Sequence, residues 1–211
     1  MTWTWLLPVS IILPMSGAAL TLVASRRPRV QRTISVTVIS VQLLVELIMI
    51  AQVTSNGPMV MHIGGWTAPL GVTLVADELA AFMLVVSTVV SLAVLVYGIS
   101  QGIADRESGP DVPISIFHPT FLILVTGVSN AFIAGDLFNL FVSFEILLTA
   151  SFVLLTSGGT RERLRAGAPY IVVSLLSSLI FLAGIAMAYA ATGTVNLADL
   201  SEKIPALPAG I

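Results

Sequence analysis

Two glutamates lie deep inside long apolar stretches of this sequence. Glu46 and Glu145 are flanked by aliphatic and aromatic residues, with no other ionisable side chain within eight positions of either. A carboxyl near the centre of a bilayer costs at least ~2.5 kcal/mol, so intramembrane carboxyls are usually retained for function. Hydrocarbon disfavours the charged form of a carboxyl, and a nearby cation favours it. A carboxyl held between these influences can take up and release a proton near neutral pH, which is the chemistry of an intramembrane relay.

Glu145 has polar neighbours at helical spacing. Asn139 and Ser143 are four residues apart and share one helix face, while Glu145 and Thr149 share another. At 1.5 Å per residue, Glu145 lies about 12 Å into the helix that begins at Leu137. We predict that Glu145 translocates protons; the alternative is a structural glutamate that hydrogen-bonds a neighbouring helix. The polar residues expected to support it are Asp136, Asn139, Ser143, Thr149, Ser174 and Ser178.

Glu46 belongs to a narrow polar stripe. Ser35, Gln42 and Glu46 fall at spacings of seven and four on one face of an otherwise aliphatic stretch. Such a stripe can line a pathway or hydrogen-bond across a contact with another helix or subunit. Because the rest of the stretch is aliphatic, we predict that Gln42 and Glu46 form a helix or subunit contact. His62 and His118 have no partner at ligand spacing, and we assign no site to them.

The composition excludes most soluble protein classes. Hydrophobic residues make up 56% of the 211 and charged residues 9%, against roughly 25% charged in ordinary soluble domains. A soluble enzyme, a nucleic-acid binder and a disordered chain are therefore excluded. The absence of cysteine excludes disulfides, iron–sulfur clusters and thiolate metal sites, and no phosphate-binding loop, nucleophile elbow or zinc motif occurs. We expect an integral membrane protein with no catalytic residue, no cofactor and no metal.

Six apolar stretches reach the length of about 20 residues that a membrane-spanning helix needs. They lack the alternating pattern of β-barrel strands, so the predicted fold is an all-α, multi-pass protein of the cell membrane. Eight of the nine basic residues follow the first, third and fifth stretches, and basic residues accumulate in cytoplasmic loops. Both termini are therefore predicted to lie outside. The predicted helices cover Thr4–Ala24, Thr33–Val53, Leu79–Ser100, Ile114–Ala134, Leu137–Thr156 and Pro169–Ala191.

The connection from Thr54 to Glu78 differs from the other loops. Turn-forming residues flank the short β-prone segments Met59–Ile63 and Gly71–Val75, which predicts a small hairpin on the outer face between the second and third helices. We divide the chain into an N-terminal three-helix segment with this hairpin, residues 1–113, and a second segment of three helices, residues 114–211.

The second half of the chain carries a recognisable pattern. His118-Pro119, the run from Gly135 to Glu145, and the run from Thr192 to Leu200 resemble the D subunit of the Mrp-type multisubunit sodium/proton antiporters. That family is related to the antiporter-like membrane subunits of respiratory complex I. The resemblance implies about fourteen helices containing inverted repeats. It also implies that Glu145 corresponds to the family's fifth-helix glutamate, which pairs with a lysine on the seventh helix.

The sequence ends after the sixth predicted helix, and no lysine or arginine lies inside any of the six stretches. We therefore expect the N-terminal portion of such a subunit, as a fragment, a split half or a truncated product, with the first repeat cut before helix seven. Without a cation, Glu145 is expected to be protonated or to find its partner on another polypeptide or segment.

Three functional hypotheses follow. The first is a membrane subunit of a monovalent cation/proton antiporter, in which Glu145 contributes to a proton-translocation path. Its expected partners are other membrane subunits of the complex, the lipid bilayer, protons and a cation such as sodium, and no nucleic acid. The second is a proton-pumping subunit of an NADH:quinone oxidoreductase-type complex, which would class the chain with translocases. The third is a truncated, purely structural membrane subunit.

Overall fold

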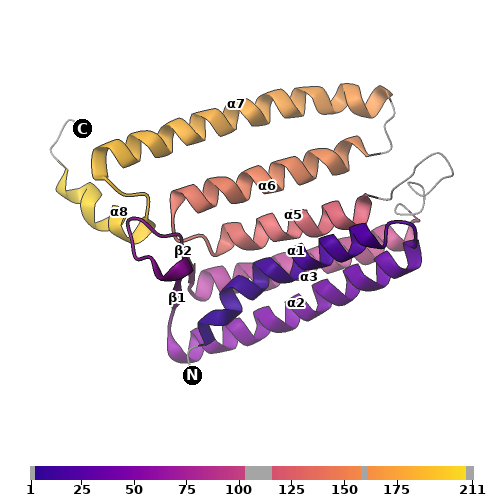
Figure 1. Ribbon diagram of the computed structural model, residues 1–211, viewed down its shortest axis with the longest axis horizontal. Helices are drawn as coiled ribbons and strands as arrows, with labels where there is room; N and C mark the ends of the chain where they lie inside the picture. Colours follow the sequence, from indigo (N-terminus) through magenta and orange to yellow (C-terminus); the bar gives the residue numbers. More distant parts are fainter. Residues whose placement is uncertain (1–2, 103–115, 158–160, 208–211) are drawn as a thin grey trace.

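A computed structural model of the chain describes residues 3–102, 116–157 and 161–207. These ranges contain six long helices, a two-stranded sheet and one short helix, so the predicted fold class is confirmed (Figure 1). Five of the helices are long and apolar enough to cross a membrane, and α5 is a shorter apolar helix. The helices are α1 Leu6–Val23, α2 Pro28–Asn56, α3 Glu78–Ser100, α5 Phe117–Phe132, α6 Leu137–Thr156, α7 Arg161–Thr192 and α8 Leu197–Lys203.

The helix bounds follow the apolar stretches, with differences at the starts of α2 and α7; α2 begins at Pro28, five residues before the predicted start at Thr33. The bounds of α6 match the prediction, because Asp136 caps its first turn by accepting a hydrogen bond from Asn139 N at 2.7 Å. α7 begins at Arg161, eight residues before the predicted start at Pro169. The prediction was wrong there because apolar runs mark only the part of a helix that hydrocarbon can cover. The predicted domain boundary after residue 113 lies outside the described residues.

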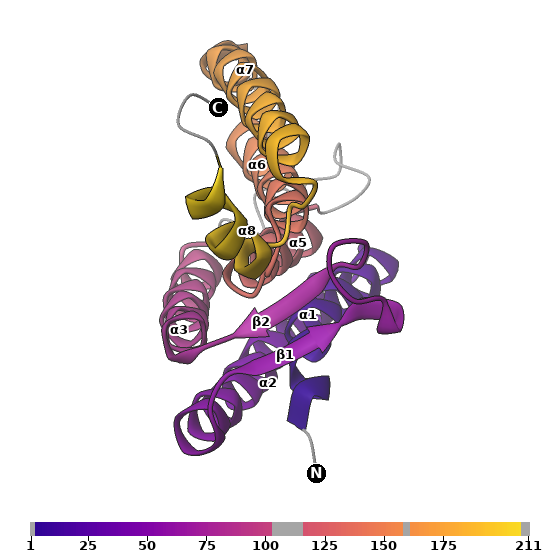
Figure 2. The same ribbon diagram turned by 90° about the vertical axis from the view of Figure 1, so that its left-hand side faces the viewer.

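The helices form a cluster and a row. Figure 2 looks along the bundle axis and shows α5, α6 and α7 in a row that extends from the cluster of α1, α2 and α3. α5 packs against α1 as well as α6, whereas α7 packs against α6 at the outer edge of the row. Gly127 permits the close approach of α5 to α6, because a Cβ there would lie 3.0 Å from Leu147 N and 3.1 Å from Ser143 O.

Two buried apolar cores lie at different depths in the bundle. The core near the hairpin includes Leu7, Met49, Leu84 and Ile133 from α1, α2, α3 and the end of α5. The core nearer the opposite end is formed by α1, α2, α3 and α5 as well. Its buried members are Ala18, Ile39, Leu95, Phe121, Leu122 and Val125. The same four helices therefore supply both cores.

The predicted hairpin is confirmed, and it pairs with segments far along the chain. β1 (Met59–His62) and β2 (Thr73–Ala76) are antiparallel, with Met59 opposite Ala76 and His62 opposite Thr73. They lie across one end of the helices (Figure 2), which we call the hairpin end. Gly135 N donates to Thr73 O at 2.8 Å, and Leu197 N donates to Gly135 O at 3.0 Å. The sheet edge is therefore covered by the α5–α6 connection, which in turn pairs with the segment before α8.

Candidate functional site

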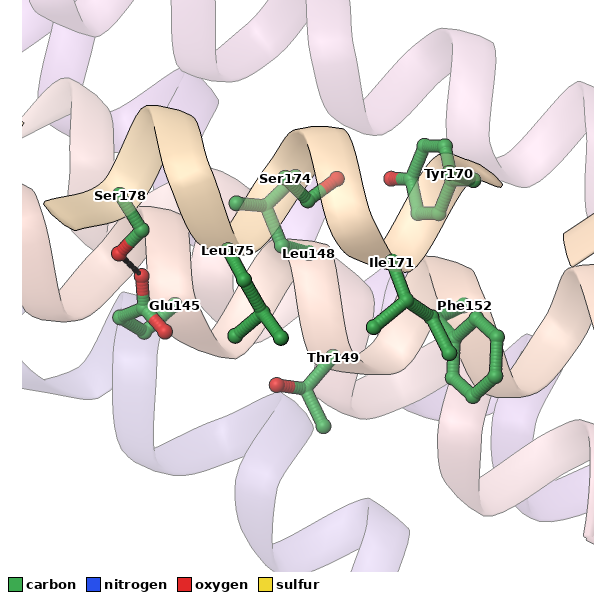
Figure 3. A pocket seen from close by; sticks show the side chains of 9 residues that line it. All are labelled: Glu145, Leu148, Thr149, Phe152, Tyr170, Ile171, Ser174, Leu175 and Ser178. Atoms are coloured by element: carbon green, nitrogen blue, oxygen red, sulfur yellow. Dashed lines mark hydrogen bonds between the residues drawn. The ribbon is translucent and has the colours of Figure 1, made fainter. Parts of the chain in front are cut away.

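Glu145 lies in the middle of α6 and faces α7. Its carboxyl is partly buried, and Oε1 accepts a hydrogen bond from the hydroxyl of Ser178 on α7 (Figure 3). The carboxyl is eight residues beyond Leu137, or about 12 Å along the axis from the hairpin end of α6. In the described ranges, every lysine and arginine lies outside the long helices or close to the starts of α2 and α7. Glu145 is thus paired with a hydroxyl on the neighbouring helix.

A cavity of about 180 Å³ separates α6 from α7 beside Glu145. Figure 3 shows the side chains that line it from both helices. Two of the predicted supporting residues on α7, Ser174 and Ser178, line this cavity, as does Thr149 on α6. The space can hold several water molecules and has polar groups to hydrogen-bond them. The structure therefore brings four of the predicted site residues together around one space that can hold water.

Tyr170 is a lining residue that the sequence analysis did not include in the site. Its hydroxyl lies 2.6 Å from Ser151 Oγ on α6. Tyr170, Ser174 and Ser178 follow one another at four-residue steps, so they occupy one face of α7. We call these three residues the hydroxyl stripe. The spacing is visible in the sequence and could have identified Tyr170. The stripe runs from Glu145 over about 12 Å away from the hairpin end.

A second cavity of about 540 Å³ lies on the other side of α6, against α5 and the end of α1. Its walls are mostly apolar, with Thr120 on α5 as a polar group facing it. Glu145 and Thr149 line this cavity as well as the first. The carboxyl of Glu145 therefore stands between two spaces, one with hydroxyl groups and one with apolar walls.

Asn139 and Ser143 lie on a different face of α6, away from the cavity beside α7. Asn130 Nδ2 on α5 donates to Ser143 Oγ at 2.7 Å and to Asn139 Oδ1 at 3.1 Å. Asn139 Nδ2 donates back to Asn130 Oδ1 at 3.3 Å. This exchange holds α5 against α6 at the level where Gly127 allows their close approach, and we assign these residues to that contact. Asn130 was not included among the predicted site residues.

Asp136 lies at the hairpin end and is 3% exposed. The side chain is therefore buried, although the sequence places Asp136 at the edge of an apolar stretch, where water can usually reach a carboxyl. Its Oδ1 caps α6, and its Oδ2 accepts a hydrogen bond from Thr73 N at 3.3 Å. Asn196 Nδ2 donates to Thr73 Oγ1 at 3.3 Å. We call Thr73, Asp136 and Asn196 the hairpin junction; its contacts give Asp136 a structural role.

The polar stripe on α2 meets other helices of this chain. Gln42 and Glu46 are fully buried, and Gln42 Nε2 donates to Ser129 Oγ on α5 at 2.8 Å. His62 is exposed in the hairpin, with Nδ1 3.2 Å from Thr73 Oγ1, and His118 is buried at the start of α5. Among the described residues, no group of three or more His, Cys, Asp or Glu could hold a metal ion.

The sequence of this chain is similar to those of known membrane transport proteins. Residues 134–210 match the family described as the membrane part of NADH:quinone oxidoreductase and Mrp antiporters. The Na⁺/H⁺ antiporter D subunit of Alkalihalophilus pseudofirmus is 36% identical over 194 residues, which are 92% of this chain and 38% of that protein. A probable K⁺/H⁺ antiporter D subunit of Rhizobium meliloti is 37% identical over 209 residues, 96% of this chain and 37% of its own length.

The structure is also similar to that of an Mrp complex subunit. A chain of the Mrp complex from Dietzia sp. superposes with a TM-score of 0.84 and 28% identity, over 94% of this chain and 36% of the other. The chain thus spans well under half the length of the proteins it matches. Localisation in the plasma membrane, as a multi-pass protein, agrees with these relatives and with the apolar helices. The chain is similar, over nearly all of its residues, to the N-terminal part of the D subunit of the Mrp-type sodium/proton antiporters.

Proposed function

We propose that this chain is a membrane subunit of a monovalent cation/proton antiporter and that Glu145 takes up and releases the transported protons. The observation that carries the proposal is the position of Glu145, near mid-helix, bonded to Ser178 and lining a cavity with the hydroxyl stripe. A carboxyl at this depth, beside space for water, is the usual form of an intramembrane proton site.

The cavity is open on one side, and this opening allows the protonation of Glu145 to be controlled from outside the chain. Glu145 is partly exposed, so a cationic side chain from another segment or subunit can approach it. Such a cation favours the charged carboxyl, and its departure favours the protonated one. The resemblance to the D subunit of the Mrp-type antiporters supplies the candidate, a lysine on the helix that follows α7 in that family. Movement of this cation would couple the protonation of Glu145 to transport.

The hydroxyl stripe supplies a route on one side of Glu145. Serine and tyrosine hydroxyls both donate and accept hydrogen bonds, so they can order water along α7 and pass protons through it. The stripe extends from the carboxyl away from the hairpin end, over Ser174 to Tyr170. We infer that protons reach or leave Glu145 along this face of α7, with other membrane subunits completing the path.

Relatives named for Na⁺/H⁺ and for K⁺/H⁺ antiport have similar identity to this chain, which supports a monovalent cation without selecting one. The matched family also includes NADH:quinone oxidoreductase subunits, so a proton-pumping subunit of such a complex is the second candidate. In both cases the chain works as a transporter subunit and does not convert a soluble substrate.

The two candidates are separated by a vesicle assay. Inverted membrane vesicles containing the complex that holds this chain are energised to form a pH gradient. Addition of Na⁺ or K⁺ should then dissipate the gradient, and vesicles from cells lacking the chain should not respond. Purification of the same complex tests the alternative: flavin and iron–sulfur subunits that co-purify, together with no response to either cation, would contradict antiport.

The hydroxyl stripe gives a matched pair of variants. Ser178→Ala removes the hydroxyl that donates to Glu145, while Ser177→Ala removes an exposed hydroxyl one position away that does not line the cavity. A hydrogen bond to a charged group contributes roughly 1.5–3 kcal/mol, so we expect Ser178→Ala to lower the proton flux by about tenfold. Ser177→Ala should leave the flux unchanged. Equal fluxes in the two variants would contradict a role for the stripe.

A further inference from the structure

A second set of polar side chains is enclosed in the bundle, away from the cavity beside α7. Glu46 and Gln42 of α2, Thr88 of α3 and Ser129 of α5 are each at most 1% exposed. Gln42 Nε2 lies 2.9 Å from Glu46 Oε1 and 2.8 Å from Ser129 Oγ, so its amide donates to both. Thr88 is the other polar side chain beside the carboxyl. We call these four residues the Glu46 cluster.

The cluster lies between the two apolar cores. Along α2, Glu46 falls between Ile39 of one core and Met49 of the other, and along α3, Thr88 falls between Leu95 and Leu84. Ser129 likewise falls between core residues of α5. Each of the three helices therefore contributes one polar side chain at the same level, with apolar packing above and below it.

Among the described residues, no cation lies near the Glu46 carboxyl. The other ionisable side chains of α1, α2, α3 and α5, the helices that pack together here, lie near the helix ends: Arg29, Arg32, Glu78, Tyr97 and His118. Arg32 is fourteen residues from Glu46, or about 21 Å along the axis of α2. Because this chain alone encloses Glu46, a cation on another subunit reaches the carboxyl only if α2, α3 or α5 moves. Glu145 differs because it is partly exposed, so a cation can approach it without such a movement.

The hydrogen bonds fit a protonated carboxyl. Glu46 Oε2 and Thr88 Oγ1 have no hydrogen bond of standard geometry to any described residue, although the two side chains lie beside each other. An ionised carboxyl in this position would be a buried charge with no counter-charge among the described residues, which is strongly unfavourable. A protonated carboxyl has one O–H donor. It accepts from Gln42 at Oε1 and donates from Oε2 to Thr88 after a small rotation.

We propose that Glu46 is a permanently neutral carboxylic acid that joins α2 to α3 and α5 and so positions α5 against α6, the helix that carries Glu145. Ser129 is followed directly by Asn130, which holds Asn139 and Ser143 of α6. α5 is therefore held on one side by the Glu46 cluster and on the other by α6. Neither cavity beside α6 includes Glu46 in its lining, so the residue positions the proton site without carrying protons.

Infrared spectroscopy of the assembled complex in lipid tests the protonation state directly. The C=O stretching band of the protonated Glu46 carboxyl is identified by its absence from Glu46→Gln. In the unchanged protein, this band is expected to persist from acid to alkaline pH, over the range in which the complex stays assembled. Glu78→Gln, at an exposed helix start, serves as the control for a carboxyl on the surface of the chain. A Glu46 band that gives way to carboxylate bands as the pH rises would overturn the proposal. This readout does not depend on the role proposed for Glu145.

Two variants test the positioning role. Glu46→Gln keeps an acceptor for Gln42 and a donor for Thr88, so assembly and proton flux should both be retained. Glu46→Leu removes the carboxyl that the buried Gln42 amide and Thr88 hydroxyl face, and we expect about tenfold less assembled complex. Glu46→Gln complexes that assemble but lose flux would make Glu46 a proton carrier and overturn the proposal. Equal assembly of Glu46→Leu and Glu46→Gln would overturn it as well.

Discussion

Glu145→Gln is expected to abolish cation-coupled proton movement by the complex that contains this chain. Glutamine keeps the size of the side chain and an oxygen that accepts from Ser178, but it has no titratable proton. Removing a positioned proton donor and acceptor typically costs on the order of 10² to 10⁴ in rate, so flux should fall to background. The measurement is dissipation of a pH gradient in inverted vesicles after addition of Na⁺ or K⁺.

Two controls make this result specific to the titratable group. Glu202→Gln changes an exposed glutamate of α8 by the same atoms and should leave flux unchanged. Glu145→Asp keeps a titratable carboxyl but withdraws it from Ser178 by one methylene, so it should retain part of the flux. An assembled Glu145→Gln complex with undiminished flux would leave only the structural interpretation of this glutamate.

Asp136→Ala is expected to destabilise the fold more than removal of Asp77, the carboxyl that caps α3. The carboxyl caps α6 through Asn139 N and also accepts from Thr73 N in β2. Loss of a helix cap costs about 1 kcal/mol, and a buried amide left without its acceptor costs roughly a further 1–3 kcal/mol. The expected loss is therefore about 2–4 kcal/mol, measured by chemical unfolding of the purified protein in lipid bicelles.

Asp77→Ala provides the matched comparison for Asp136→Ala. Asp77 caps α3 by accepting from Ala80 N at 2.7 Å, but it is exposed and no described residue of a second element bonds to it. Its removal should cost about 1 kcal/mol, the value of a cap alone. The difference between the two variants measures the contribution of the cross-link to Thr73. If the two variants lose equal stability, the hairpin junction contributes nothing beyond capping.

The helices and the hairpin were predictable because both depend on local signals. The length of an apolar run compared with the thickness of hydrocarbon gives the six helices, and turn formers between β-prone segments give β1 and β2. The strands Met59–His62 and Thr73–Ala76 differ from the predicted ones by at most two residues at either end. The predicted start of α7 is wrong because polar residues extend the helix beyond the apolar run.

The partners of the polar side chains were less predictable. Helical spacing correctly separates Asn139 and Ser143 from Glu145 and Thr149, but it does not say which neighbouring helix each face meets. Asn130 meets the first pair, and α7 meets the second. The bond between Asn196 and Thr73 joins residues 123 positions apart, and no local pattern in the sequence marks it. Such pairings depend on how the helices pack, which single-sequence periodicity leaves open.

The hairpin junction constrains the order in which the chain can be built. β2 is synthesised before α3, the α5–α6 connection that covers its edge follows α5, and Asn196 arrives only after α7. During translation the edge of β2 therefore stays uncovered until α5 and the residues that follow it have been made, and exposed edges recruit other strands. The bond from Asn196 to Thr73 forms only after α7 has been synthesised, so completion of the hairpin junction is a late step of biogenesis.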